Sequence, residues 1–205
     1  SNGTIKNLNL LTLNLKENDY IVCADGGANY IKRMNIYPNV IMGDLDSINS
    51  QVLGYAKKSN IPIIKFPSHK DKTDTELAID HLIEKGCNEI LLMGVTGSRL
   101  DHTLGNITLL YKLMNKGIKG RIIDDNNVVY IVKDRIKLYN KRGSYVSIIP
   151  LTDNGAVVSL EGFEYRLNSY HIDFASTLGI SNRILGKEAF VEIEKGVCLI
   201  IESRD

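Results

Sequence analysis

The chain has 205 residues, 43% of them hydrophobic and 24% charged, which is the balance of a folded globular protein and excludes a disordered chain. Its 25 basic residues are offset by 24 acidic ones, so the net charge of +1 disfavours nucleic acid or a membrane surface as partner, and no apolar run approaches the roughly 18 residues of a membrane span. Cys23, Cys87 and Cys198 lack the spacing of a zinc site or a disulfide framework, which favours reduced thiols and a cytoplasmic location.

Short apolar runs alternate with amphipathic stretches between residues 20 and 124. We predict buried strands at residues 20–24, 40–42, 61–66, 89–93 and 121–123. The stretches between them carry apolar residues at helical spacing, most clearly at residues 77–83 and 100–114. This alternation predicts a parallel sheet with helices on its faces, which is an α/β domain of the Rossmann-like kind.

Two segments have the S/T-x-x-acid spacing of a capping box, in which a hydroxyl and an acidic side chain satisfy free amides at the start of a helix. They are residues 73–76 and 98–101, and both follow a predicted strand closely. We therefore expect one helix to begin at each of these places.

The pattern changes after residue 126, where short β-rich runs are divided by glycine and asparagine turn signals. We predict strands at residues 128–132, 136–139, 145–149, 156–160, 189–193 and 197–201. This spacing is typical of an all-β sandwich or barrel. The sequence therefore predicts two domains, residues 1–126 and residues 127–205.

Acidic, polar or glycine residues follow every predicted strand of the first domain. In an open parallel sheet, ligands bind outside the carboxyl ends of the strands. Asp44 and Asp46 directly follow the second strand, and Asp74 lies in the first turn of a predicted helix. Because Mg²⁺ prefers a few carboxylates together with waters and substrate phosphate oxygens, these three aspartates are predicted metal ligands.

A glycine-bearing turn at residues 94–99 opens the predicted helix at 100–114. Its amides and Arg99 could bind a phosphate, although it is neither a Walker loop nor a GxGxxG motif. Lys70 and Lys72 are candidate phosphate contacts, with solvated surface lysines as the alternative. His102 and Asn106 share one helix face, and either a ligand contact or a capping and packing role fits them.

Four segments resemble, in order, the motif blocks of the thiamine pyrophosphokinase family. They are residues 24–29 (ADGGAN), 43–47 (GDLDS), 71–78 (DKTDTELA) and 96–102 (TGSRLDH). The β-rich tail with residues 179–182 (GISN) resembles the second domain of that family. The likeness covers nearly the whole chain, and four ordered blocks are far more specific than one.

The resemblance implies a homodimer that transfers the diphosphoryl group of ATP to the hydroxyl of thiamine and releases AMP. It implies Mg²⁺ as cofactor and ATP as co-substrate. Residues 1–126 would be the nucleotide-binding catalytic domain, and residues 127–205 the β-sandwich that binds thiamine. The site would lie at the subunit interface.

The resemblance also implies roles for single residues. The catalytic residues would be Asp25, Asp44, Asp46, Asp74 and Asp101, with the metal on Asp44, Asp46 and Asp74. The nucleotide-binding residues would be Gly26, Gly27, Asp46, Lys72, Thr73, Thr96, Gly97, Arg99 and His102. The thiamine-binding residues would be Asp101, Asn106, Ser181 and Asn182. Lys72 and Arg99 would balance the developing charge, and either Asp101 or Asp25 would orient the thiamine hydroxyl.

Three departures and three rival functions stay open. The strand that the family pattern places ahead of Asn2 and Gly3 is missing or truncated, which leaves a contribution of Gly3 to phosphate binding open. Ser98 stands where a second glycine is expected, and the chain has no tryptophan, so an aromatic wall for thiamine must come from tyrosine or phenylalanine. The rivals are a DxD-type phosphohydrolase with Asp44 as nucleophile, a metal-dependent nucleotide-sugar transferase, and a non-catalytic dimer that senses nucleotide and thiamine.

Overall fold

The computed structural model describes residues 1–205 apart from the side chain of Leu11, and the chain divides into two compact units. The first unit is Ser1–Lys119 and the second is Gly120–Asp205. The division precedes the sequence-based boundary at 126/127 because the strand that begins at Lys119 pairs with a strand of the second unit. No helix in the described part of the chain has the length and apolar character needed to span a bilayer.

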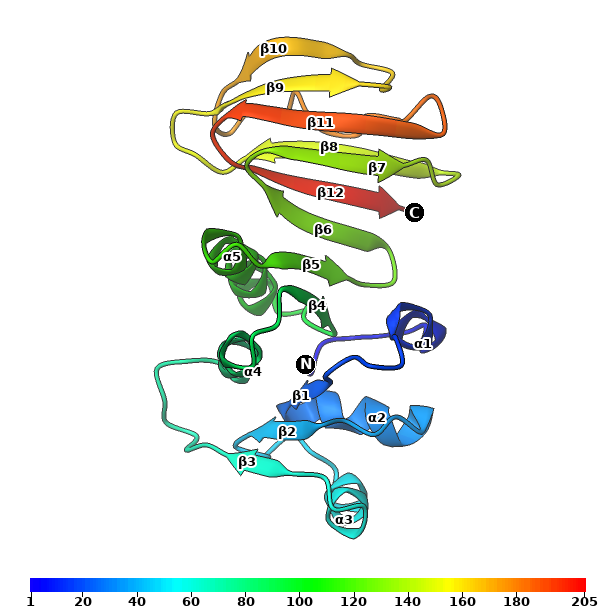
Figure 1. The fold of residues 1–205 in the computed structure, drawn as a ribbon, viewed down its shortest axis with the longest axis vertical. Coiled ribbons are helices and arrows are strands. Elements are labelled where there is room, and N and C mark those ends of the chain that lie inside the picture. The colour runs from blue at the N-terminus through cyan, green and yellow to red at the C-terminus, as the bar shows by residue number, and fades with distance from the viewer. The chain divides into compact units, whose positions relative to one another are not determined.

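The first unit is an α/β domain (Figure 1). Its elements in chain order are α1 (Asn9–Asn14), β1 (Val22–Ala24), the 3-10 helix η1 (Asp25–Gly27), α2 (Ala28–Met34), β2 (Val40–Gly43), α3 (Ser50–Lys58), β3 (Ile63–Lys65), α4 (Asp74–Glu84), β4 (Glu89–Met93) and α5 (Leu100–Asn115). Strands β1, β2 and β3 form a parallel sheet in that order, with Val22 beside Val40 and Ile41 beside Ile63. The carboxyl ends of neighbouring strands therefore lie at one edge of this sheet.

Apolar side chains from strands and helices fill the core of this unit. Ile41 of β2 is completely buried in a cluster with Cys23, Ile31, Val52 and Ile61. Because Ile31 and Val52 come from α2 and α3, the helices cover the sheet as the alternating sequence pattern predicts.

The parallel sheet is smaller than the sequence predicts. Of the five strands expected in one sheet, β1, β2 and β3 form a three-stranded parallel sheet of their own. The strand expected at 121–123 is the end of β5 (Lys119–Ile123), which pairs antiparallel with β6 (Asn127–Val132). Backbone amides of Gly3 and Thr4 donate to carbonyls beyond the end of β4, at Gly94 (2.6 Å) and Thr96 (3.1 Å). Apolar runs predict strands but do not determine which neighbours they pair with, which explains the error.

Of the two predicted capping boxes, the first is present in its hydroxyl half, while the Glu76 carboxylate pairs with Lys112 (2.9 Å). Thr73 is the N-cap of α4, and its Oγ1 accepts a hydrogen bond from Glu76 N (3.2 Å). The box predicted at residues 98–101 is wrong, because α5 begins at Leu100 with Arg99 as its N-cap, and the Arg99 side chain does not cap the helix. Instead, Thr103 Oγ1 accepts from the amide of Gly97 (3.2 Å), which ties the preceding turn to the helix.

The second unit is a sandwich of two antiparallel sheets (Figure 1). Its remaining strands are β7 (Arg135–Tyr139), β8 (Ser144–Pro150), β9 (Ala156–Glu161), β10 (Leu167–Ile172), β11 (Glu188–Lys195) and β12 (Cys198–Arg204). Within this unit, the strands of one sheet follow the order β5-β6-β12-β8 and those of the other the order β10-β9-β11-β7. This arrangement confirms the all-β second domain that the sequence predicts.

The core of the sandwich lies between its sheets. Ile148 and Ile200 from one sheet pack in one cluster with Val158 and Val191 from the other, and all are essentially inaccessible to solvent. β10 is the one strand of this unit that the sequence pattern does not predict. Its pairing with β9 shifts register between Leu167 and Tyr170, and most of its side chains are exposed, so no alternation of apolar and polar residues marks it.

Candidate active site

Three aspartates from separate strand exits come together in the first unit. Asp25 follows β1, Asp44 follows β2, and Asp74 begins α4. One carboxylate oxygen of each lies within 4.8 Å of the others. The parallel pairing of β1 with β2 places the first two side by side, and the Thr73 cap fixes the start of the helix that carries the third. The structure therefore gathers oxygen ligands of the kind that Mg²⁺ prefers.

The backbone at Asp25 is held in an unusual conformation. Its φ is +44°, in the left-handed region, where a non-glycine residue costs roughly 1–3 kcal/mol. Gly43, at the end of β2, lies close behind Asp25, so that a Cβ at Gly43 would lie 3.1 Å from Cα and Cβ of Asp25. Gly43 itself has a φ of +150°. A glycine at the second strand exit is thus a requirement for the position of the aspartate at the first.

The surroundings separate the pKa values of the clustered aspartates. A hydrogen bond from the amide of Asp46 to Asp44 Oδ1 (3.2 Å) lowers the pKa of Asp44, and Lys70 and Ser68 act in the same direction. Burial raises the pKa of Asp74 by more than Lys70 lowers it, and the charges of Asp25 and Asp44 raise it further. Asp44 is therefore the more firmly ionised of these two.

Two carboxylate oxygens of the cluster lack a hydrogen-bond donor. Within the described part of the chain, Asp25 Oδ1 and Asp74 Oδ1 are buried and accept no hydrogen bond, although Lys70 Nζ forms an ion pair with the latter at 3.3 Å. Buried acceptors without donors are unfavourable in proteins. A divalent cation would satisfy both oxygens, so the residues present fit Mg²⁺.

Lys70 contacts this cluster, a placement that the sequence alone does not reveal. Its Nζ lies 3.3 Å from Asp74 Oδ1 and 3.9 Å from Asp44 Oδ2, and it donates to the carbonyl of Pro67 (3.1 Å). Lys72, two residues later, pairs instead with Asp80 of α4 (2.8 Å). Lys70 lies in the loop before α4, where the i, i+4 spacing of helical pairs does not apply, so the sequence offers no signal that separates the two lysines.

Asp46 lies outside the cluster that the other three aspartates form. Its side chain is exposed, and its Oδ1 accepts a hydrogen bond from Ser47 Oγ (2.9 Å). Its backbone amide donates a hydrogen bond to Asp44 Oδ1. The chain turns between the two aspartates at Leu45, whose φ is +72°. Of the carboxylates at i and i+2, only that of Asp44 therefore belongs to the oxygen cluster. Asp25 is the third member of the cluster, in the position predicted for Asp46.

The fourth sequence block presents an exposed ion pair at the start of α5. Arg99 Nε and Nη2 donate to the two carboxylate oxygens of Asp101, at 3.2 and 2.5 Å. This bidentate contact lowers the pKa of Asp101 to about 2. His102 follows in the same turn and is also exposed. All three side chains are accessible to a ligand from solvent.

The backbone positions predicted to bind nucleotide lie in tight turns. Gly26 and Gly27 are buried in η1, directly after Asp25. Thr96 accepts from the amide of Thr4 through its carbonyl, and Gly97 is exposed. Each of these turns follows the end of a strand, as the sequence predicts.

Asn106 lies in α5, and its buried side chain points toward the turn that precedes this helix. Its Nδ2 donates to the carbonyl of Val95 (2.7 Å), and only 7% of the residue is exposed. Of the two roles that the sequence left open, this contact supports packing and positioning. The amide holds the turn that carries Gly97 and Arg99.

The segment at residues 179–182 runs beside β8 in the second unit and is hydrogen-bonded to it. The carbonyl of Gly179 accepts from Ile148 N (2.9 Å), and Ser181 N donates to Ser147 Oγ (3.1 Å). Asn182 is 4% exposed, and its side chain both accepts from Tyr165 N (3.0 Å) and donates to Tyr165 O (2.7 Å). Asn182 therefore fixes Tyr165, while Ser181 is exposed.

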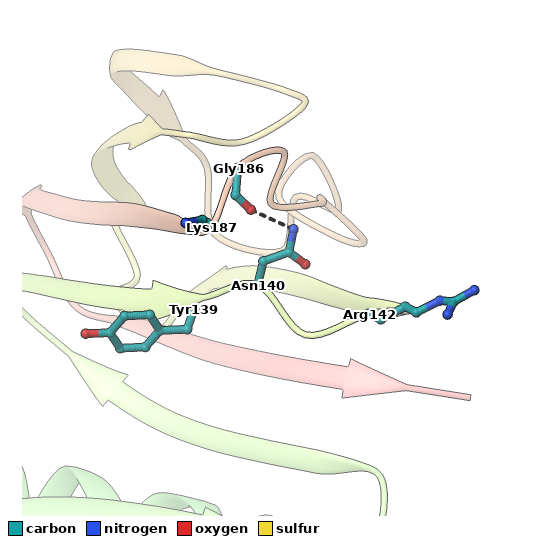
Figure 2. Close-up of a pocket in the computed structure, with 5 residues that line it drawn as sticks. All are labelled: Tyr139, Asn140, Arg142, Gly186 and Lys187. Carbon is teal, nitrogen blue, oxygen red and sulfur yellow. Dashed lines mark hydrogen bonds between the residues drawn. The ribbon is translucent and has the colours of Figure 1, made fainter.

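A shallow depression in the second unit is lined by Tyr139, Asn140, Arg142, Gly186 and Lys187 (Figure 2). Asn140 Nδ2 donates to the carbonyls of Gly186 (2.7 Å) and Ile184 (2.9 Å). The Tyr139 ring and the Arg142 guanidinium point in different directions in Figure 2. Because these groups do not converge, we assign no ligand to the depression, and Asn140 serves to anchor residues 184–186.

Comparison with known proteins decides the family. The model of the thiamin pyrophosphokinase catalytic domain matches residues 11–122, and the model of the thiamin pyrophosphokinase vitamin B1 binding domain matches residues 133–198. The chain belongs to the thiamine pyrophosphokinase family. It is therefore a transferase, and the family that its four sequence blocks resemble is confirmed.

Individual thiamine pyrophosphokinases are similar over nearly the whole chain. The thiamine pyrophosphokinase of Bacillus subtilis is 37% identical over 185 residues, which are 88% of this chain and 86% of that protein. A crystal structure of thiamine pyrophosphokinase from Bacillus subtilis matches with a TM-score of 0.89 at 34% identity, covering 95% of this chain and 92% of that one. A crystal structure of thiamin pyrophosphokinase from Geobacillus thermodenitrificans matches with a TM-score of 0.84 at 32% identity, covering 95% and 91%. An α/β domain followed by an antiparallel β domain is thus the thiamine pyrophosphokinase fold.

Proposed function

We propose that this chain transfers the diphosphoryl group of ATP to the hydroxyl oxygen of thiamine, giving thiamine diphosphate and AMP. The observation that carries the proposal is the cluster of Asp25, Asp44 and Asp74 in a chain of the thiamine pyrophosphokinase family. Phosphoryl-type transfer depends mainly on positioning and on neutralising the charge of the polyphosphate. The carboxylate cluster with Lys70 in contact, in a unit that also carries the exposed Arg99, has the chemistry for both.

Asp25, Asp44 and Asp74 are the residues that would hold Mg²⁺. The ion would neutralise phosphate charge and orient ATP for in-line displacement at the β-phosphorus. Asp46 stays in the proposal in two roles, because its amide fixes Asp44 and its exposed carboxylate is available to nucleotide and metal.

Arg99 is the cation that we propose for the ATP phosphates. Its side chain is 69% exposed, and a guanidinium binds phosphate oxygens in the same bidentate way that it now binds Asp101. Asp101 stays ionised at neutral pH because its pKa is about 2, so it can accept a hydrogen bond from the thiamine hydroxyl, with Asp25 as the alternative. The remaining nucleotide contacts that we propose are Gly26, Gly27, Lys72, Thr73, Thr96, Gly97 and His102.

For thiamine we propose direct contacts with Ser181 and Tyr165 of the second unit and with Asp101 of the first. Within each unit a buried asparagine would hold these contacts in place, Asn182 beside Tyr165 and Asn106 behind the turn before α5. Tyr165 is 66% exposed, and Asn182 holds its backbone from both sides. Because the chain has no tryptophan, Tyr165 is the aromatic side chain that we assign to stack on the cationic ring of thiamine.

We further propose a cytoplasmic homodimer with its site at the subunit interface. Leu100, Leu104 and Tyr111 lie on one face of α5 and are 66%, 54% and 40% exposed. An apolar stripe of this kind is typical of an interaction surface. Sedimentation tests the dimer, because a monomer that is fully active at nanomolar concentration would contradict it.

An assay of AMP release from ATP, with and without thiamine, tests the proposed reaction. We expect AMP only when thiamine, ATP and a divalent cation are all present. Release of phosphate without thiamine would favour the phosphohydrolase. Binding of ATP and thiamine without AMP would favour the sensing dimer.

A further inference from the structure

An ammonium group lies where the carboxylates of the site meet. Lys70 comes from the loop between β3 and α4, and its Nζ has three oxygen partners: Asp74 Oδ1 at 3.3 Å, Asp44 Oδ2 at 3.9 Å and the carbonyl of Pro67 at 3.1 Å. Its side chain is 16% exposed, so the contact is mostly shielded from solvent. This lysine is therefore held at the site by two ion pairs and one hydrogen bond.

We propose that Lys70 acts as a built-in competitor of the divalent cation. Its ammonium holds Asp44 and Asp74 together when no metal is bound, and metal binding exchanges the ammonium for the ion. Lys70 is in this view a positioning residue. The inference rests on the proposed function, because it takes the carboxylate cluster as the metal site.

Electrostatics supports the exchange. Three carboxylates with oxygens within 4.8 Å of one another repel, and one positive charge among them offsets part of that repulsion. A divalent ion bound to the same oxygens and an ammonium 3.3–3.9 Å from them would repel each other strongly. The flexible four-carbon stem of lysine allows the ammonium to leave. Free enzyme should therefore bind metal more weakly than the carboxylates alone would allow.

Lys72 provides a matched comparison. It lies two residues further along the same loop and carries the same charge, but its Nζ pairs with Asp80 at 2.8 Å and its side chain is 49% exposed. Substituting either lysine by methionine removes one positive charge from the same part of the surface. Only Lys70→Met removes a charge from the carboxylate cluster.

The experiment is a titration of the nucleotide-free protein with Mn²⁺, in which electron paramagnetic resonance measures the free ion. We expect Lys70→Met to bind Mn²⁺ about tenfold more tightly than wild type, since a positive charge within about 4–6 Å lowers the proton affinity of a carboxylate by about tenfold or more and should act on a metal cation in the same direction. Lys72→Met and the charge-conserving Lys70→Arg should not tighten binding. Equal Mn²⁺ affinity in Lys70→Met and Lys72→Met would overturn the inference.

Thermal unfolding gives a second readout that does not depend on turnover. In a chelator, Lys70→Met should melt below wild type, and added Mn²⁺ should raise its Tm by more than it raises that of wild type or of Lys72→Met. Failure of the proposed function would look different: wild type and Asp44→Asn would bind Mn²⁺ equally, and no thiamine-dependent AMP would form. If wild type binds Mn²⁺ through Asp44 and turns over, but Lys70→Met changes neither Mn²⁺ affinity nor the Tm shift, only the role of Lys70 is refuted.

Discussion

The side-chain amide of Asn106 donates a 2.7 Å hydrogen bond to the backbone carbonyl of Val95, and both residues are buried. This single contact joins the middle of α5 to the turn that follows β4. Because Gly97 and Arg99 belong to that turn, the position of the proposed phosphate contacts depends on a residue that faces away from solvent.

Replacing Asn106 by alanine should therefore destabilise the fold. Loss of the amide leaves the Val95 carbonyl buried without a donor, and we expect the free energy of unfolding to fall by roughly 1–3 kcal/mol. Urea unfolding measures this, with His102→Ala on the exposed side of the same helix as a control that should change stability by less than about 0.5 kcal/mol. A variant with unchanged stability but a raised KM for thiamine would restore Asn106 as a direct thiamine contact.

Asp44→Asn and Asp46→Asn separate the two members of the DxD motif. Asp44→Asn should reduce turnover by about 100-fold or more and also abolish Mn²⁺ binding without nucleotide, because Asp44 belongs to the carboxylate cluster. Asp46→Asn should reduce turnover while leaving nucleotide-free Mn²⁺ binding near that of wild type, since its amide still supports Asp44. Steady-state kinetics and Mn²⁺ titration check both. Wild-type turnover in Asp46→Asn would remove its carboxylate from the site.

Asp80 should make folding pH-dependent. Burial raises the pKa of Asp80, but the hydrogen bonds and charges of Lys112 and Lys72 outweigh it, so the pKa lies below its ordinary value of 3.8. A depressed carboxyl pKa contributes stability above the unfolded-state value, and this stability is lost as the pH falls through the folded-state pKa. Asp80→Asn should cost about 0.5–1 kcal/mol at pH 7. Urea unfolding of both proteins at descending pH should show the difference vanishing; a constant difference would contradict the ion-pair origin.

Gly179 and Gly54 form a pair with opposite expectations. A Cβ at Gly179 would lie 2.2 Å from the carbonyl oxygen of Ile148, so Gly179→Ala must push the 179–182 segment off β8 and raise the KM for thiamine. Gly54 lies in α3, where nothing lies within 4 Å of an added Cβ, and Gly54→Ala should stabilise the protein by about 0.5–1 kcal/mol. Thermal unfolding and thiamine kinetics test the pair. Unchanged thiamine kinetics in Gly179→Ala would separate this segment from substrate binding.

Tyr165→Ala should raise the KM for thiamine about tenfold with little change in the KM for ATP, because stacking on a cationic ring contributes of the order of 1 kcal/mol or more. Tyr165→Trp should restore it. Because the side chain is largely exposed, neither change should alter stability much. Equal thiamine kinetics in the alanine variant would assign the aromatic wall to another residue.

The sequence predicts the first unit's elements well but not their full pairing. Apolar runs correctly locate β1, β2, β3 and β4, and the Thr73 cap correctly starts α4. They do not predict that β5 pairs antiparallel with β6, although only residues 124–126 separate the two strands, because the sequence pattern assigned residues 121–123 to the parallel sheet. The sequence pattern also misses β10. This strand is mostly polar and its register shifts, so it shows no regular alternation of apolar and polar residues.

The candidate site could be predicted as a set of strand exits but not as a geometry. The rule for parallel sheets correctly brings Asp25, Asp44 and Asp74 to one edge. Spacing alone could not exclude Asp46 from the cluster, because the turn at Leu45 is a matter of backbone conformation. It also could not distinguish Lys70 from Lys72, whose different partners depend on where α4 and the carboxylates lie.

The close approach of Gly43 to Asp25 divides the site into a preorganised half and an adaptable half. Asp25 is locked by its left-handed backbone and by the end of β2, so its carboxylate is in place before any ligand arrives. Lys70 sits on a connecting loop and has only side-chain and single carbonyl contacts to break. Rearrangement on ligand binding is therefore expected on the loop side, while the sheet side serves as a fixed template.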